Sequence, residues 1–378
     1  MNVKTLFQKI LKRLRGGRVI LRPSVVSRGR VLLSYKTDPF FDFDKKEAYH
    51  SNMWECREIA NIFLRLGYTV DVIDWFDYQF VPHERYDYFI DLGLQMRRIG
   101  GRLNADCVKV FHTTTSHWRF NNAAERERLA ALAARRGAEL KPRRLLAESF
   151  GVEDADFCTL IGNGATESTY AFANKKMHRI PVSTARTHPF PDKRDIERAK
   201  KNFIWLGGVG AVHKGLDLVL EAFALMPEYH LTVCGDVATE TDFADEYRRE
   251  LYETENITYR GRVDIGGDAF SALANTAIAA INPSCAEGQS VTAIDCMHAG
   301  LIPVLTAETG VDTGDFGVRI DEPTVDGIVR VVRTIAAMEN DELVRRSREA
   351  WKYARKNNTR ERFSEEFTKF VTMLEKDT

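Results

Sequence analysis

The sequence predicts an α/β protein made of two doubly wound parallel-sheet domains. The chain has 378 residues, which is more than a single hydrophobic core usually supports. Short β-rich runs alternate with helical patterns along it, as they do where helices connect parallel strands. This alternation stops at residues 180–194, a polar stretch with three prolines, and then starts again. We therefore expect one domain on each side of that stretch.

The first domain is expected at residues 28–190 and the second at residues 191–355. Short apolar runs predict strands, and apolar residues at helical spacing predict helices. Gly67 ends the first of these helices. In the first domain the predicted strands are 30–35, 68–73, two that end at 91–93 and 111–112, and 156–162; the predicted helices are 51–66, 121–136 and a short one after 163. In the second domain the predicted strands are 203–208, 230–235, 256–261, 277–283 and 301–306, and helices open near 215, 243, 268 and 290.

Three further segments complete the chain. Pro189 and Pro191 hold the stretch between the domains extended, as an interdomain hinge requires. Helical patterns follow the second domain, and the C-terminal helix at 356–378 is expected to pack back on the first domain. Residues 1–27 form a basic segment with apolar residues at helical spacing, which predicts an amphipathic helix. This helix either lies on an anionic membrane surface or docks on its own domain, and the sequence leaves both open.

Composition excludes several classes of protein. Apolar residues make up 44% and charged residues 29%, which is typical of a soluble globular protein, and the formal net charge of zero gives no general attraction for nucleic acid. The six cysteines are scattered without a CxxC pair, which favours small buried side chains in a reduced compartment. No run has the roughly twenty apolar residues of a membrane span. The expected location is the cytoplasm, with the inner face of a membrane as the alternative.

A glycine-rich loop follows the first strand of the second domain, where ligands of parallel sheets bind. Its glycines, Gly207, Gly208 and Gly210, allow close approach of the backbone to a phosphate, and Lys214 precedes the next helix. The loop begins a GxGxxG dinucleotide pattern, but His213 takes the place of the third glycine. Nicotinamide binding is therefore disfavoured.

The segment 283–304 carries the most information about function. Glu287 lies on a predicted loop and Asp295 lies eight positions later, inside a predicted helix that starts near Ser290. The free amides of a first helical turn bind phosphate, and carboxylates accept hydrogen bonds from hydroxyl groups. This combination suits a phosphorylated, hydroxyl-rich ligand such as a nucleotide sugar.

These motifs resemble the nucleotide-sugar-binding domain of the retaining glycosyltransferases of group 1. That family has the GT-B fold, in which two Rossmann-like domains face each other across a cleft. The resemblance lies in Lys214-Gly215 after the glycine loop, and in Pro283-Ser284 followed by Glu287-Gly288 through Asp295. It covers the second half of the chain, since the first half matches less well.

The resemblance implies roles for named residues. Lys214 would neutralise the donor diphosphate, Glu287 would contact the donor sugar, and Asp295 would bind the ribose hydroxyls. A histidine of the first domain would reach the sugar, and both His112 and His117 are candidates. The other implied donor-binding residues are Gly208, Gly210, Arg260, Arg262, Val263, Gly288, Gln289, Ser290, Val291 and Thr292.

The sequence departs from the family in two places. Asp295 stands where a glutamate is usual, and Val209 stands where many members have an arginine that binds phosphate. The diphosphate charge would then rest on Lys214, on main-chain donors, or on another cation such as Arg262. Four arginines of the first half form a basic cluster: Arg135, Arg136, Arg143 and Arg144. This cluster either holds an anionic acceptor or forms a solvated face.

The function implied by the resemblance is transfer of a hexosyl group from a nucleoside-diphosphate sugar to an acceptor hydroxyl, with retention, in polysaccharide or lipid-linked glycan synthesis. No metal or other cofactor is expected, because the histidines form no HxH or HExxH pattern. The DxD pair at 42–44 follows an early strand of the first domain, the pair at 154–156 is at a strand entry, and the stretch 312–315 is only a possible third pair of acids. Two alternatives remain: a sugar-nucleotide epimerase of the same fold, and a catalytically silent sugar-nucleotide-binding protein.

Overall fold

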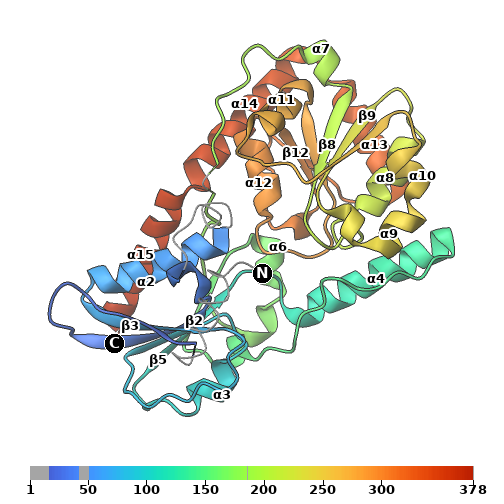
Figure 1. Ribbon diagram of the computed structural model, residues 1–378. Coiled ribbons are helices and arrows are strands. Elements are labelled where there is room, and N and C mark those ends of the chain that lie inside the picture. The colour runs from blue at the N-terminus through green and yellow to red at the C-terminus, as the bar shows by residue number, and fades with distance from the viewer. Residues whose placement is uncertain (1–16, 42–50, 185, 378) are drawn as a thin grey trace, which may run out of the picture.

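The computed structural model describes residues 17–41, 51–184 and 186–377, and it consists of two α/β domains (Figure 1). One sheet uses strands from the first half of the chain and the other uses strands from the second half. The predicted fold class, two doubly wound parallel-sheet domains, is confirmed.

The first sheet has seven strands in the order β1-β3-β2-β4-β5-β6-β7, and only the β1–β3 pair is antiparallel. Its strands are β1 (Val19–Leu21), β2 (Gly29–Tyr35), β3 (Tyr68–Asp74), β4 (Tyr88–Asp91), β5 (Val108–Thr113), β6 (Phe157–Leu160) and β7 (Met177–Arg179). The helices and 3-10 turns of this half are η1 (Asp38–Phe40), α2 (Ser51–Arg65), α3 (Met96–Gly100), α4 (Trp118–Arg136), α5 (Gly151–Asp154), α6 (Gly164–Ser168) and η3 (Ala171–Ala173).

The second sheet has six parallel strands in the order β10-β9-β8-β11-β12-β13. Its strands are β8 (Asn202–Leu206), β9 (His230–Cys234), β10 (Ile257–Gly261), β11 (Ala279–Asn282), β12 (Ile302–Leu305) and β13 (Val318–Arg319). The helices and 3-10 turns of this half are α7 (Ile196–Ala199), α8 (Leu216–Ala224), η4 (Val237–Thr239), α9 (Thr241–Glu246), α10 (Arg248–Tyr252), α11 (Asp268–Thr276), α12 (Val291–His298), η5 (Ala307–Thr309), α13 (Val325–Ala336), α14 (Asn340–Asn357) and α15 (Arg360–Asp377).

Both sheets are covered on both faces because their strands are apolar on both sides. In β8, Phe203 and Trp205 pack with α8 and α13, whereas Ile204 and Leu206 pack with α11 and α12 on the opposite face. In the first sheet, α2 and α15 cover one face, and α3 and α5 cover the other. Side chains of successive strand residues point to opposite faces, so a continuous apolar run indicates a strand buried on both sides.

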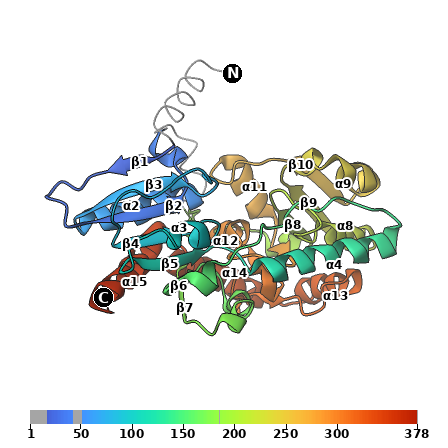
Figure 2. The same cartoon turned by 90° about the horizontal axis from the view of Figure 1, so that it is seen from below.

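Helix α4 belongs to the first half of the sequence but extends along the second domain (Figures 1 and 2). Gly137, with φ of 72°, ends it in the left-handed conformation that favours glycine. Leu132 of α4 is fully buried in the core beneath α8 and α13, and Leu129 and Leu140 pack against the same core. The second core therefore includes side chains from the first half of the chain.

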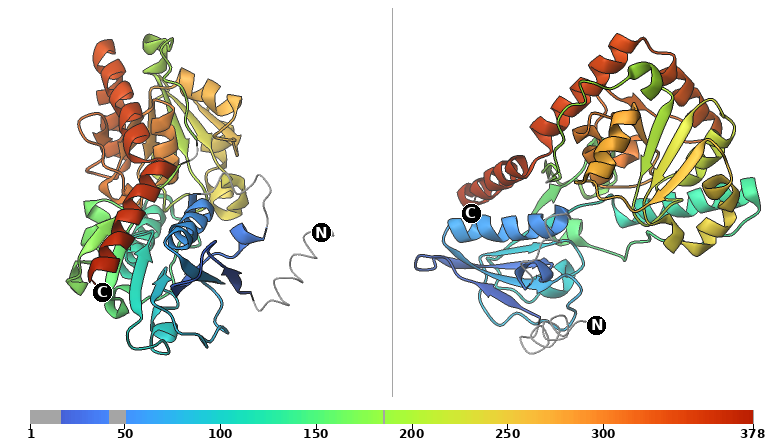
Figure 3. Two further views of the ribbon diagram at one scale, coloured as in Figure 1. Left: turned by 90° about the vertical axis from the view of Figure 1, so that its left-hand side faces the viewer. Right: turned by 45° about the horizontal axis from the view of Figure 1, so that its top comes forward.

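Two other connections link the domains. Residues 180–184 and 186–195 run between the sheets without helix or strand, where the proline-rich hinge was predicted. Helices α14 and α15 then return from the second domain to the first, and α15 lies beside α2 (Figure 3). Its side chains Phe363 and Phe367 are fully buried in the same apolar cluster as Ile59 and Phe63 of α2. This apolar contact anchors the C-terminal helix on the first domain.

The sequence did not predict several elements, among them β1, β7, β13 and α13. Strand β1 has only three residues and lies in the basic segment 1–27, while the amphipathic helix predicted within that segment lies outside the described residues. Helix α13 was missed although its apolar residues recur at helical spacing, because its β-branched residues and Gly327 have a low helix propensity. Across the part of the chain that the structure describes, no helix is both long and apolar enough to cross a bilayer.

Candidate functional site

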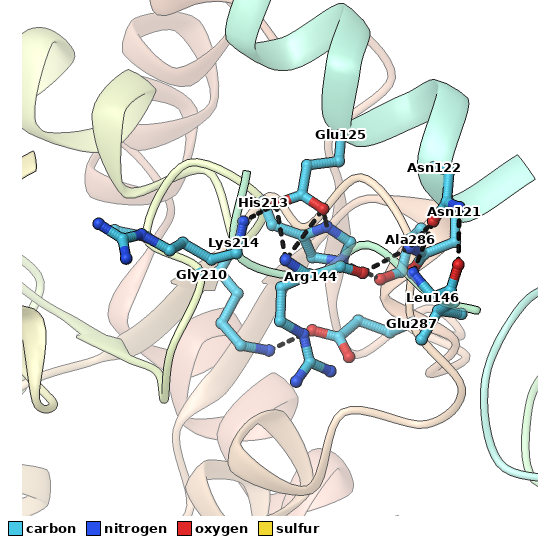
Figure 4. Close-up of polar contacts among 12 residues, drawn as sticks. Asn121, Asn122, Glu125, Arg144, Leu146, Gly210, His213, Lys214, Ala286 and Glu287 are labelled. Carbon is cyan, nitrogen blue, oxygen red and sulfur yellow. Dashed lines mark hydrogen bonds and ion pairs between the residues drawn. The ribbon is translucent and has the colours of Figure 1, made fainter. Parts of the chain in front are cut away.

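The candidate site lies at the carboxyl ends of β8 and β11, where two loops of the second domain meet. The ammonium group of Lys214, from the loop after β8, donates to the carboxylate of Glu287, from the loop after β11 (Figure 4). Their side chains are only 12% and 11% exposed, respectively. The structure therefore brings together two residues that are 73 positions apart and that the sequence had placed in one site.

The surroundings of Glu287 hold its carboxylate ionised. Burial alone would raise the pKa of this group, but the positive charges of Lys214 and Arg144, and that of His213 when it is protonated, outweigh burial and lower the pKa to about 2. For His213, burial lowers the pKa, and the ring is hydrogen bonded through Nε2 to the carbonyl of Ala286. At neutral pH the pair therefore consists of a carboxylate and an ammonium group beside a neutral imidazole.

The glycine loop differs from the expectation in one respect. Gly210 has φ of 98°, in the region that favours glycine, but its amide donates to the buried carboxylate of Glu240, and so does the amide of Ala211. The backbone at Gly210 was predicted to approach a phosphate, and in this conformation Glu240 occupies its amide. Gly208 is exposed and keeps open space around its Cα.

The loop after Glu287 packs against the first domain. A Cβ at Gly288 would lie 2.1 Å from the carbonyl oxygen of Thr114 and 2.7 Å from that of Ile161, so only glycine fits there. Gln289 accepts a hydrogen bond of 2.8 Å from the amide of Val182 in the interdomain segment. Gly288 and Gln289 therefore hold the two domains together, a role that sequence analysis did not predict.

Helix α12 begins directly after this loop. Ser290 is its N-cap residue but makes no capping hydrogen bond; its hydroxyl lies 3.1 Å from that of Thr292. Val291 is partly buried against the core that joins the domains. The amino end of α12, which carries the positive end of the helix dipole, thus lies next to Glu287 along the chain.

Asp295, on the second turn of α12, contacts the interdomain segment. Its Oδ1 accepts a hydrogen bond of 2.6 Å from the hydroxyl of Thr184, and its Oδ2 lies 3.7 Å from the guanidinium of Arg186. Burial raises its pKa to about 6, against the opposing effects of Thr184 and Arg186. The contacts of Asp295 are therefore with the hinge, whereas those of Glu287 are with the glycine loop.

The predicted base-binding residues lie at the end of β10 and directly after it, at the same edge of the sheet. Arg260 is exposed, and Arg262 has a side chain that is 83% exposed and lies 3.7 Å from Asp236. Val263 is partly buried against α11. The side chain of Arg262 is thus exposed to solvent beside Asp236, and it contacts neither Lys214 nor Glu287.

Both candidate histidines of the first domain are buried. His112 is fully buried, with Nδ1 2.7 Å from the hydroxyl of Thr159 and its ring against Phe367 of α15. His117 is the N-cap residue of α4 and packs against Tyr170 and Phe172. Burial lowers the pKa of each histidine to about 4. Both imidazoles are therefore neutral at pH 7, and neither presents an open surface to a substrate in this conformation.

The predicted basic cluster does not form a free surface. Arg135 pairs with Asp217 and Glu221, both on α8. Arg136 and Arg143 pair with further acids of the second domain: Glu246, Glu250 and Asp242. Ion pairs with the second domain satisfy the charge of these three arginines, which disfavours the acceptor-binding alternative for them. Arg144, the fourth, lies beside the Lys214–Glu287 pair (Figure 4).

Two acids that shape the site were not predicted. Glu125 of α4 is buried and accepts hydrogen bonds from the amides of Arg143 and Arg144. Glu240 accepts from the glycine loop, as described above. Both are single acids in charged stretches, and their partners are distant in the sequence, so no local pattern could identify them.

The remaining chemistry of the described residues is limited. The six cysteines are buried and form no disulfide, as predicted for small buried side chains. Within residues 17–41, 51–184 and 186–377, no group of three or more histidine, cysteine, aspartate or glutamate residues is arranged to hold a metal ion. A hollow of about 530 Å³ lies at the opposite edge of the second sheet, near Asn202 and His230, away from the Lys214–Glu287 pair.

Comparisons with known proteins agree with this architecture. Residues 200–337 match the family described as "Glycosyl transferases group 1". No curated protein matches the chain. Among solved structures, sucrose-phosphate synthase from Thermosynechococcus elongatus has a TM-score of 0.62 at 15% identity, over 92% of this chain and 99% of that one.

Two further structures share the fold. HepE of Anabaena, in complex with UDP and glucose, has a TM-score of 0.56 at 12% identity, over 92% of this chain and 100% of HepE. TarM of S. aureus, in a complex that contains UDP, has a TM-score of 0.52 at 11% identity, over 74% of this chain. The chain spans only 54% of that TarM chain. The resemblance to group 1 glycosyltransferases predicted from the motifs around Lys214 and Glu287 is confirmed: the protein has the GT-B fold, and its residues 200–337 match the group 1 glycosyltransferase family.

Proposed function

We propose that the protein is a retaining glycosyltransferase that moves a hexosyl group from a nucleoside-diphosphate sugar to an acceptor hydroxyl. The observation that carries this proposal is the buried Lys214–Glu287 pair at the carboxyl edge of the second sheet, inside the matched region 200–337. The UDP named in the HepE and TarM structures supports a nucleoside diphosphate as part of the donor.

Lys214 and Glu287 have different roles in this proposal. The ammonium group of Lys214 stabilises negative charge that develops on the departing diphosphate. Glu287, which stays ionised because its pKa is about 2, accepts hydrogen bonds from hydroxyl groups of the donor sugar. The amino end of α12 adds a positive potential on the same side.

In the proposed step, the bond between the anomeric carbon and the diphosphate oxygen breaks, and a bond to the acceptor oxygen forms on the same face of the sugar. The acceptor proton passes to the departing phosphate oxygen, so no enzyme nucleophile is required. Lys214 and helix amides supply the positive charge, and we propose that the reaction needs no metal ion. Activity should therefore persist in a chelator such as EDTA.

The test uses the full-length chain with a panel of UDP-, GDP- and ADP-sugars and simple glycan acceptors. Lys214→Ala and Glu287→Gln should each reduce transfer by about 100-fold or more, as loss of a charge-stabilising group typically does. The matched control is Lys200→Ala, because Lys200 pairs with Glu197 at 2.8 Å near the opposite edge of the sheet. Transfer at the wild-type rate in both site variants would exclude the proposed site. The anomeric configuration of the product, measured by NMR, tests retention.

One observation favours a second candidate, a catalytically silent sugar-nucleotide-binding protein. His112 and His117 are both buried, so neither presents a side chain to the donor sugar in this conformation. Such a protein would bind UDP or GDP in calorimetry but release no nucleoside diphosphate with any acceptor. Release of nucleoside diphosphate that depends on an acceptor would exclude it.

The acceptor class is proposed to be a polysaccharide or a lipid-linked glycan, with the basic N-terminal segment holding the protein at an anionic membrane surface. Deletion of residues 1–16 should then reduce sedimentation with vesicles of anionic lipid, while transfer to a soluble acceptor is unchanged. Equal sedimentation of both proteins would remove the membrane part of the proposal.

A further inference from the structure

Arg144 lies on the glycine loop, although it comes from the first half of the chain. It belongs to the segment after α4, and its aliphatic stem packs on the Cα of Gly210: a Cβ at Gly210 would lie 2.5 Å from Cγ of Arg144. From there its guanidinium reaches the Lys214–Glu287 pair (Figure 4). Gly210 therefore permits the left-handed backbone of the loop and also leaves room for this arginine.

The backbone of Arg144 is fixed by buried groups of α4. Its amide donates to both oxygens of Glu125, at 2.8 and 3.0 Å. Its carbonyl accepts a hydrogen bond of 2.8 Å from the side chain of Asn121. Both Glu125 and Asn121 are buried. The position of the guanidinium is thus set by α4, and only the end of the side chain is free to adapt to a ligand.

The charges of the site indicate what Arg144 can do. The ammonium of Lys214 and the carboxylate of Glu287 cancel each other, and His213 beside them is neutral. Val209, on the loop itself, is half exposed and carries no charge. Within the part of the chain that the structure describes, Arg144 has no carboxylate within ion-pair distance, whereas its neighbour Arg143 pairs with Asp242. Arg144 therefore places beside this pair a positive charge that no ion pair of the described residues cancels.

We propose that Arg144 is the second cation of the diphosphate site, so that a residue supplied by the first half of the chain completes a pocket of the second domain. A guanidinium can donate two parallel hydrogen bonds to phosphate oxygens. A nucleoside diphosphate carries several negative charges, which the neutral Lys214–Glu287 pair alone does not balance. This inference rests on the proposed function and identifies how the leaving group is held.

The test compares binding of UDP, GDP and ADP to the wild-type chain and to Arg144→Met, which keeps the stem that packs on Gly210 but loses the charge. The dissociation constant for the preferred nucleotide should rise about 10- to 100-fold, as expected for loss of hydrogen bonds to a charged group. Arg144→Lys should lose less, because it keeps one charge. Arg143→Met is the matched control and should change the dissociation constant less than about threefold.

A second variant tests whether charge, and not packing, explains the loss. Adding Val209→Arg to Arg144→Met places a guanidinium on the same loop and should recover most of the affinity. Equal affinity of the wild type and Arg144→Met, or an equal loss in Arg143→Met, would overturn the inference, and so would a double variant that recovers nothing. These outcomes leave the proposed function intact, whereas a wild-type chain that binds none of the nucleotides overturns both.

Discussion

Glu287 and Asp295 are buried carboxylates of one segment, yet their surroundings act on them in opposite directions. Lys214, Arg144 and His213 lower the pKa of Glu287 to about 2 in spite of burial. Burial raises the pKa of Asp295 to about 6, and its closest partner is the neutral hydroxyl of Thr184. Burial is common to both, so the charge of the partners decides the difference.

The interdomain segment is held at two adjacent residues by carboxyl groups from different domains. Ser183 is bound to Glu55 of α2, in the first domain, through its amide and its hydroxyl, both at 2.9 Å. The next residue, Thr184, is bound to Asp295 of α12, in the second domain. Burial raises the pKa of Glu55 to about 7. The glycine-loop side of the second domain therefore holds a stable charge, whereas the hinge is fixed by two carboxyl groups that are easily neutralised.

The largest expected effect comes from removing the cation on the charged side. Lys214→Ala leaves Glu287 buried beside Arg144 alone, and the free energy of unfolding at pH 7 should fall by about 3 kcal/mol. Urea denaturation followed by circular dichroism measures this. Adding Glu287→Gln should recover part of the loss, because the buried charge is then removed. A Lys214→Ala variant as stable as the wild type would mean that the pair contributes little to the fold.

On the hinge side, Glu55→Gln should stabilise the protein as the pH rises. The pKa of Glu55 is raised from 4.5 to about 7, so its contribution to stability is fully present below pH 4.5 and is lost as the pH rises through 7. The variant and the wild type should therefore be equally stable near pH 4, and the variant should gain on the order of 2–3 kcal/mol by pH 8. Urea midpoints at pH 4, 6 and 8 check this; a constant difference across the range would contradict the raised pKa.

Asp295→Asn sharpens the contrast with Glu287 directly. The stability that Asp295 contributes is present below pH 3.8 and is lost as the pH rises through 6, so the variant should gain on the order of 2 kcal/mol by pH 8. Glu287→Gln should behave in the opposite way: the wild type should be the more stable protein above pH 4.5, and its advantage should fall as the pH is lowered toward 2. If the stability difference from the wild type changed with pH in the same direction for both variants, the proposed contrast between Asp295 and Glu287 would be wrong.

The smallest effect is expected from Thr184→Val, which removes the hydroxyl but keeps the shape of the side chain. Loss of one hydrogen bond to the carboxylate should cost about 1–2 kcal/mol at pH 8. In the Asp295→Asn background the same change should cost less, because the acceptor is no longer charged. The double-mutant cycle gives the coupling between the two residues, and a coupling of zero would mean that the 2.6 Å contact contributes nothing.

The sequence predicted most of the fold because the information is local. The strand β8 and the loop after it, for example, follow from an apolar run that ends in glycines and from Lys214 before the helix. Strand β1 could not be predicted in the same way, because three residues at a sheet edge give no periodic signal. Helix α13 contains several β-branched residues, which favour strands as much as helices.

The sequence likewise predicted the part of the site that depends on local pattern and missed the part that depends on domain packing. Lys214 and Glu287 were placed together because each follows a parallel strand, and such loops share one edge of the sheet. The hinge contact of Asp295 and the burial of His112 depend on how the domains pack, which no local pattern specifies. The arginines of α4 could not be assigned either, since the acids that they contact are 82 to 114 positions away in the sequence.

The path of α4 has a practical consequence for dividing the chain. A fragment cut at the hinge would carry the whole second sheet but would lack Leu132, leaving a gap in its core. It would also expose a row of acids with no counter-ions: Asp217, Glu221, Asp242, Glu246 and Glu250. Repulsion among these acids would lower the stability of the fragment in dilute buffer. Added salt screens this repulsion, so salt should stabilise the fragment more than it stabilises the intact chain. The second domain should therefore be stable only when residues 118–150 stay attached or are supplied as a separate peptide.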